Sequence, residues 1–309
     1  MRVFHPLFIL SFLFVVIQSS SAAEHTLLSN IGTYEVVEDD FIYLTVDGIE
    51  LSAHSYRPRK NGILPSVIDV HGGAWNFNDR MAGLNYNKAL ASSGIYVLAI
   101  DFRQAPAFQH PLGSRDVVSA ICYLTSNAEN LTIETENLGL IGSSSGGHLA
   151  LLAGLKPNAD MHSAITKEST GNRLEDVAVK YIIALWPVSD PHYRYLYARK
   201  TGRDRLVTAH NNYFKNEGEM KDASIQRILR SGEATENLPP VLIVEPGEDL
   251  NIPREMTNEL MKSFQDAGGK ADHLFYPGMP HAFGHRDSAA TDDLNLAMRD
   301  FISRQLSGR

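Results

Sequence analysis

Residues 138–155 read LGLIGSSSGGHLALLAGL, which is a short apolar run, a glycine- and serine-rich turn and a segment of strong helix formers. A short apolar run bounded by turn residues is typical of a strand that is buried on both faces. Leucine and alanine dominate residues 149–155 and favour a helix directly after the turn. A strand, a tight turn and a helix in this order predict one unit of a parallel α/β sheet.

The same alternation extends to both sides of this unit. Short apolar runs at residues 66–70, 96–100, 179–185, 241–244 and 273–276 predict further buried strands. Each run is short and shows little polar alternation, which is the habit of strands in a parallel sheet.

Helix signals separate the predicted strands. Asp79 is expected to cap a helix that stops at Gly94, and Pro253 to lie in the first turn of a second helix that ends at Gly268. Apolar residues at helical spacing within residues 294–302 predict a last helix.

The predicted fold class is α/β, with a mostly parallel central sheet and helices on both faces. An antiparallel hairpin is expected at the start, because β-prone residues 41–46 and 50–57 flank an Asp-Gly pair. The polar interval at residues 156–230 is longer than a simple connection and predicts a small inserted lid around the strand at 179–185. Residues 24–309 are expected to form one domain.

The first 23 residues predict an export signal. Arg2 precedes an apolar run at residues 7–17, and small residues follow at 19–23. This order is typical of a secretory signal peptide, with cleavage expected after Ala23. The apolar run is short for a membrane span, which needs about 20 residues. We therefore expect a secreted or periplasmic protein, with an uncleaved anchor as the alternative.

Composition narrows the function classes. The chain has 309 residues, 43% of them hydrophobic, and a formal net charge of −8. No run of Lys and Arg offers the basic surface that nucleic acid needs, so no nucleic-acid partner is expected. The single cysteine, Cys122, excludes an intramolecular disulfide and is interpreted as a buried core thiol. The histidines lack metal-ligand spacing and no Gly-x-Gly-x-x-Gly opens a helix, so neither metal nor cofactor is expected.

The turn after the strand at 138–141 has the spacing Gly-x-Ser-x-Gly. Only Ser144 is centred between Gly142 and Gly146, with Ser143 and Ser145 on either side. A serine on a sharp strand-to-helix turn, with small neighbours, is typical of a nucleophile elbow. A glycine- and serine-rich turn without chemistry is the alternative, and the flanking strand and helix argue against it.

A second glycine-rich turn, His-Gly-Gly-Ala-Trp at residues 71–75, follows the strand at 66–70. Backbone N–H groups in such a turn can stabilise an oxyanion, and loss of one such donor costs roughly 3 to 4 kcal/mol. We expect Gly73 and Ala74, together with the N–H of Ser145, to form the oxyanion hole. His71 is interpreted as a structural residue that shapes the turn.

A nucleophilic serine needs a base, and the base needs an orienting acid. In an α/β sheet with this elbow, the acid and then the histidine follow the serine in the chain. Asp249, after the strand at 241–244, is the candidate acid, with Glu248 and Glu245 as alternatives. His281, after the strand at 273–276, is the candidate base. His285 and His273 compete with it.

Four ordered motifs carry a family resemblance: residues 70–75, 101–106, 142–148 and 280–283. Together they resemble the hormone-sensitive-lipase-like α/β-hydrolases, and most of all their feruloyl-esterase-like (BD-FAE-type) branch. The resemblance spans roughly residues 41–306. It implies an α/β-hydrolase fold, an oxyanion hole at the His-Gly turn and an acyl-enzyme on the elbow serine.

This chain departs from the family pattern in three places. Ser143 stands where the family often has an acidic residue or histidine, and Ser145 where it often has alanine. The loop at 247–253 lacks the usual Asp-Pro step. Arg103 and Asp116 are interpreted as a buried scaffold ion pair rather than as catalytic groups.

Aromatic residues supply candidates for the pocket wall. Trp75 and Trp186 are the two candidates, and core packing is the alternative for each. Tyr193, Tyr195 and Tyr197 lie in the insertion and are expected either to line an aromatic pocket or to form its core.

The resulting prediction is a serine carboxylic-ester hydrolase with a small-molecule ester as substrate. Two alternatives stay open: an amidase or formamidase on the same three residues, and a hydrolase-fold binding module without catalysis. No stable membrane insertion is expected after removal of the signal, and the sequence leaves the oligomeric state open.

Overall fold

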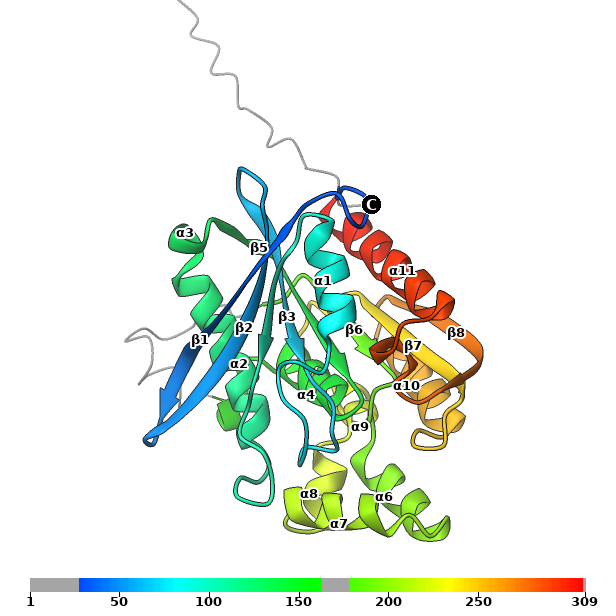
Figure 1. Cartoon of the computed structure of the whole chain (residues 1–309). Coiled ribbons are helices and arrows are strands. Elements are labelled where there is room, and N and C mark those ends of the chain that lie inside the picture. Colours follow the sequence, from blue (N-terminus) through cyan, green and yellow to red (C-terminus); the bar gives the residue numbers. More distant parts are fainter. Residues whose placement is uncertain (1–27, 163–177, 308–309) are drawn as a thin grey trace, which may run out of the picture.

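An eight-stranded sheet forms the centre of the structure, a computed structural model that describes residues 28–162 and 178–307 (Figure 1). In spatial order its strands are β1 (Val36–Val46), β2 (Ile49–Pro58), β4 (Tyr96–Ile100), β3 (Leu64–Val70), β5 (Ile133–Ser143), β6 (Tyr181–Leu185), β7 (Val241–Glu248) and β8 (Ala271–Pro280). β2 pairs antiparallel with β1 and β4, and every other neighbouring pair is parallel.

Helices cover both faces of this sheet and bury two separate apolar cores. One face carries α1 (Leu84–Ser92) and α11 (Ala289–Leu306), whose apolar residues share one core. The other face carries α2 (Leu112–Ser126), α4 (Ser145–Leu155), α9 (Ile225–Ser231) and α10 (Arg254–Asp266), which share the second. Short elements are α3 (Ala128–Leu131) and the 3-10 turn η1 (Phe283–His285). The mostly parallel α/β architecture predicted above is confirmed.

The predicted strands and the predicted hairpin are all present. Asp47 and Gly48 have φ values of 51° and 74°, the left-handed backbone that a tight turn between β1 and β2 requires. Apart from the first two residues of the run at 179–185, the predicted strands lie within β3 to β8, and β5 also includes a partly exposed segment before its apolar run. The prediction of burial on both faces is wrong for β8, which is an edge strand whose residues are half-buried or exposed. Cys122 is buried as expected, and burial raises the pKa of its thiol to about 12.

Two helix starts differ from the sequence predictions. Asp79 does not cap α1, because its carboxylate instead accepts the N–H of Met81 at 2.9 Å in a separate turn, and the helix begins at Leu84 after Gly83. Pro253 is the residue before α10 rather than part of its first turn. The side-chain bond of Asp79 has the local form of a cap, so the sequence cannot distinguish it from a true one.

The expected insertion contains β6, the helices α6 (Pro191–Lys200), α7 (Asp204–Tyr213) and α8 (Glu217–Asp222), and nearly all of α9. Figure 1 shows α6, α7 and α8 grouped beyond one end of the sheet, below α4 and α9. The expected signal peptide, residues 1–23, and part of the insertion, residues 163–177, lie outside the described residues. Among the helices described, none combines the length and the apolar character that crossing a bilayer requires.

Arg103 and Asp116 form the predicted buried ion pair. Arg103 Nη2 lies 2.7 Å from Asp116 Oδ1, and the N–H of Arg103 donates to Oδ2 at 2.8 Å. The side chains are 3% and 0% exposed. Burial raises the pKa of Asp116, while the Arg103 guanidinium opposes that rise. The pair fixes the segment after β4 to α2.

We expect Arg103→Met to lower the free energy of unfolding by about 3–5 kcal/mol, because it leaves the Asp116 carboxylate buried without its cation. The same substitution at Arg59, which pairs with Glu35 on the surface, should cost less than about 1 kcal/mol. Urea denaturation of both variants measures the difference. Equal losses would contradict a structural role for the buried pair.

Candidate active site

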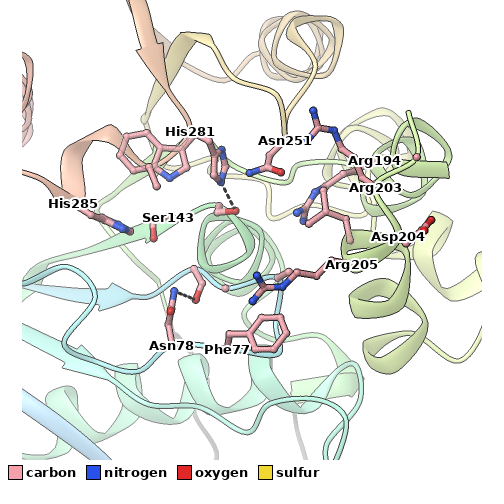
Figure 2. Close-up of a pocket in the computed structure, with 18 residues that line it drawn as sticks. Phe77, Asn78, Ser143, Arg194, Arg203, Asp204, Arg205, Asn251, His281 and His285 are labelled. Carbon is pink, nitrogen blue, oxygen red and sulfur yellow. Dashed lines mark hydrogen bonds between the residues drawn. The ribbon is translucent and has the colours of Figure 1, made fainter. Parts of the chain in front are cut away.

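The residues singled out from the sequence meet at the carboxyl ends of the parallel strands. The turn at 71–75 follows β3, Ser144 follows β5, Asp249 follows β7 and His281 follows β8. A pocket of about 660 Å³ opens there (Figure 2). In open α/β sheets this edge is where ligands usually bind.

Ser144 lies on a strained turn between β5 and α4. Its φ of 54° and ψ of −116° are backbone angles that a non-glycine residue rarely adopts. The turn also brings backbones very close together, since a Cβ added at Gly146 would lie 2.0 Å from the carbonyl oxygen of Val70. The Gly-x-Ser-x-Gly spacing therefore exists because larger residues would not fit.

A continuous chain of hydrogen bonds joins the three predicted residues. The hydroxyl Oγ of Ser144 lies 3.0 Å from His281 Nε2, and His281 Nδ1 lies 2.7 Å from Asp249 Oδ2. A carboxylate only accepts, so Nδ1 carries the proton that it donates to Asp249, and Nε2 is left to accept from Ser144. The arrangement prepares His281 to take a proton from the serine hydroxyl.

Asp249 is held in place by the backbone that follows it. Its second oxygen, Oδ1, accepts the N–H groups of Asn251 at 2.7 Å and Ile252 at 3.0 Å. Its side chain is 3% exposed. Both carboxylate oxygens therefore have partners, and these bonds hold the carboxylate beside His281 Nδ1.

The competing candidates lie elsewhere. Glu245 pairs with His273 at 2.8 Å and with Arg254 at 3.2 Å, so these two alternatives bind each other rather than Ser144. Glu248 has an exposed side chain. His285 does line the pocket, but burial, with smaller effects from His281 and His71, lowers its pKa to about 4 and keeps it neutral.

The turn after β3 lies directly against the nucleophile. Gly73, Ala74 and Trp75 all have positive φ, at 121°, 53° and 62°, so the chain doubles back beside the elbow. Gly72, Gly73 and Ala74 line the pocket together with Ser144. A Cβ added at Gly72 would lie 3.1 Å from the Cβ of Ser144. This role for Gly72 was not predicted from the sequence, although the Gly-Gly pair pointed to it.

Ser145 connects the two turns. Its hydroxyl accepts the N–H of Trp75 at 3.1 Å, which fixes the turn after β3 to the start of α4. Ser145 is also the first residue of α4, and the first N–H groups of a helix have no acceptor within the helix. Its side chain is therefore structural, and its backbone N–H has no acceptor within α4. Ser145 is fully buried and is not among the residues that line the pocket.

His71 lies beneath this turn. It is fully buried, its ring stacks on Phe102 at 4.4 Å, and its Nδ1 lies 2.7 Å from the carbonyl oxygen of Gly72. Burial lowers its pKa and keeps the ring neutral. These contacts fit the structural interpretation made from the sequence.

The two tryptophans predicted as pocket wall differ. Trp186 lines the pocket, with its ring 6.3 Å from that of His281. Trp75 is fully buried and stacks on Tyr213 at 5.1 Å, so its assignment to the pocket wall is wrong. Its ring packs among His148, His210, Tyr213 and Phe214 instead. Of the insertion tyrosines, Tyr195 packs against the core, and none of the three lines the pocket.

The insertion supplies pocket residues that the sequence analysis did not identify. The charged ones are Arg194, Arg203, Asp204 and Arg205. Figure 2 shows them on the side of the pocket opposite His285. The richness of this interval in arginine was visible in the sequence, but nothing there indicated that three of them share one cavity. Among residues 28–162 and 178–307, no group of three or more His, Cys, Asp and Glu side chains is placed to hold a metal.

An eight-stranded, mostly parallel sheet with a serine elbow after β5 and a histidine after β8 defines the chain as an α/β-hydrolase-fold protein. More narrowly, the chain belongs to the BD-FAE family, whose model matches residues 55–264. A solved structure supports the fold: esterase B from Lactobacillus rhamnosis superposes with a TM-score of 0.72 at 22% identity, covering 87% of this chain and 88% of that one.

Curated relatives add two comparisons. Esterase LipC of Mycobacterium tuberculosis is 29% identical over 245 residues, which are 78% of this chain and 58% of the relative. Kynurenine formamidase of Meyerozyma guilliermondii is 40% identical over 88 residues, which are 28% of this chain and 32% of that protein. The chain spans just over half the length of the first curated relatives that it matches.

Proposed function

We propose that the protein is a serine carboxylic-ester hydrolase in which Ser144, His281 and Asp249 act together. The observation that carries the proposal is the chain of hydrogen bonds from Asp249 through His281 to Ser144, which ends in a pocket. Membership of the BD-FAE family and the names of the relatives, esterase LipC among them, support ester bonds as the target.

In the first half of the reaction, Ser144 Oγ attacks the ester carbonyl carbon while His281 Nε2 takes the hydroxyl proton. The carbonyl oxygen becomes an oxyanion, and Asp249 stabilises the imidazolium that forms. When the oxyanion collapses, the bond to the alcohol oxygen breaks and His281 gives its proton to that oxygen. The alcohol leaves, and the acyl group stays bonded to Ser144.

In the second half, water attacks the acyl carbon while His281 takes a proton from it. Collapse of the second oxyanion breaks the bond to Ser144 Oγ, which recovers its proton from His281, and the carboxylic acid is released. We propose that the N–H groups of Gly73, Ala74 and Ser145 stabilise both oxyanions. The contact of Ser145 Oγ with the N–H of Trp75 supports this, because it holds the two donor segments together before substrate arrives.

Amide hydrolysis is the second candidate, favoured by the local match to a kynurenine formamidase. We expect a higher kcat/KM for p-nitrophenyl acetate than for N-formylkynurenine, measured on the same preparation and corrected with Ser144→Ala. A clear preference for N-formylkynurenine would replace the ester proposal with the amide one. Absence of turnover and of any burst with both compounds would favour a binding module.

Export remains part of the proposal. The basic, apolar and small-residue order of residues 1–23 supports it. N-terminal sequencing of the protein from its own cells should begin at Glu24, and retention of the leader would favour an anchored form.

A further inference from the structure

Three arginines of the insertion face the pocket that contains Ser144. Arg194 comes from α6, Arg203 directly precedes α7, and Arg205 lies in the first turn of α7. Figure 2 shows all three on the side of the pocket opposite His285. The only carboxylate side chain among the described lining residues is that of Asp204, so this wall of the pocket is cationic.

Arg194 is the most unusual of the three. It is 1% exposed, and its Nε and Nη1 atoms are buried without a hydrogen-bond partner among the described residues. Its guanidinium carbon lies 5.8 Å from the centroid of the Trp75 ring. Buried guanidinium groups in proteins are normally paired with an acid, because an uncompensated buried charge is costly.

No acid of the pocket satisfies Arg194. Asp249 is near enough for its charge to act on the guanidinium, but both of its oxygens are already bound, to His281 and to the N–H groups of Asn251 and Ile252. Asp204 is exposed, and within the described part of the chain it does not bond Nε or Nη1 of Arg194. Burial lowers the pKa of Arg194 to about 10, which still leaves the group charged at neutral pH.

The two other arginines extend the same wall toward solvent. Arg203 is half-buried, and its Nε is also without a partner. Arg205 is exposed and lies over the ring of Phe77, 4.8 Å from its centroid. The pocket is thus lined by one buried guanidinium with two unpartnered nitrogen atoms and by two more accessible guanidinium groups, which supply the charge and the donors for an anion.

We propose that these arginines form an anion subsite, and that the substrate is an ester that carries a carboxylate. The planar guanidinium donates two parallel N–H bonds, which match a carboxylate. The carboxylate would replace the missing partner of Arg194 while the ester carbonyl lies at Ser144. This inference rests on the proposed ester hydrolysis for its reaction, but the binding site itself does not depend on turnover.

Paired substrates test the inference. On the acyl side, mono-p-nitrophenyl adipate is compared with its neutral methyl ester. On the alcohol side, 4-acetoxybenzoate is compared with methyl 4-acetoxybenzoate. In at least one pair the wild-type protein should have the higher kcat/KM for the anion. Arg194→Met should lower that anion-to-neutral ratio by about 10- to 100-fold, the range expected for a hydrogen bond to a charged group.

Arg199→Met is the matched control. Arg199 lies on the same helix α6, is exposed and is outside the pocket. The Arg199→Met substitution changes the net charge by the same amount as Arg194→Met and should leave the anion-to-neutral ratio of kcat/KM unchanged. If Arg194→Met does not fold, the double variant Arg203→Gln/Arg205→Gln provides a second test, because Arg203 is half-buried and Arg205 is exposed. It should also lower the anion-to-neutral ratio of kcat/KM. An equal ratio in the control and the pocket variants would overturn the inference.

A binding measurement separates this inference from the proposed function. Calorimetry on Ser144→Ala should find monomethyl adipate bound more tightly than dimethyl adipate, with the difference lost in Ser144→Ala/Arg194→Met. Equal binding of the two compounds, together with a wild-type preference for neutral esters, would overturn the anion subsite and leave ester hydrolysis standing. Selective binding without turnover of any ester would overturn the hydrolase proposal alone.

Discussion

Ser144→Ala should lower kcat for an activated ester by about 10⁴- to 10⁶-fold, the largest effect that we expect from any single substitution in this chain. The hydroxyl is the atom that forms the covalent bond to the acyl group, and its only catalytic base, His281 Nε2, lies 3.0 Å away. The residual rate would come from the turn after β3 and from binding alone. Steady-state kinetics with p-nitrophenyl acetate measures the loss.

The neighbouring serine supplies the control. Ser143→Ala changes the same kind of group one position earlier, at the end of β5, where the side chain is fully buried. We expect it to cost far less activity than Ser144→Ala. If Ser143→Ala abolished turnover and Ser144→Ala did not, the nucleophile would be assigned to the wrong register of the elbow.

Asp249→Asn should lower kcat by about 10⁴-fold while leaving the fold intact. The carboxylate now accepts the proton of His281 Nδ1 at 2.7 Å and two backbone N–H groups. An amide can offer only one acceptor oxygen, and its NH2 group favours the histidine tautomer that has no free Nε2 lone pair. Ser144 would then lose its base.

Glu248→Gln makes the same chemical change one residue earlier on an exposed side chain. It should retain most of the wild-type kcat. Because Glu248 was an alternative for the acid, the two variants decide between them directly. A loss in Glu248→Gln equal to or greater than that in Asp249→Asn would move the orienting acid to Glu248.

The positions of Ser144, Asp249 and His281 could be predicted from the sequence because each follows its own strand in a fixed order. Parallel strands end at one edge of the sheet, so chain order alone brings these three loops together. The hairpin at Asp47 and Gly48 could also be predicted, because a tight turn with positive φ strongly prefers Asp and Gly at these positions.

Other features depend on packing that no local pattern encodes. Asp79 bonds to a backbone N–H in the manner of a helix cap, yet α1 begins five residues later. Trp75 was predicted as pocket wall, yet it is fully buried and stacks on Tyr213. The shared cavity of Arg194, Arg203 and Arg205 arises only from the way in which α6 and α7 fold over the sheet edge.

The most direct test of the central assignment is covalent labelling with an alkyl fluorophosphonate, followed by peptide mass spectrometry. One phosphonyl adduct per chain is expected, on the peptide that contains residues 142–147, with fragment ions that place it on Ser144. The adduct should be absent from Ser144→Ala. An adduct on Ser143 or Ser145, or no adduct on the folded protein, would contradict the assignment of Ser144 as the nucleophile.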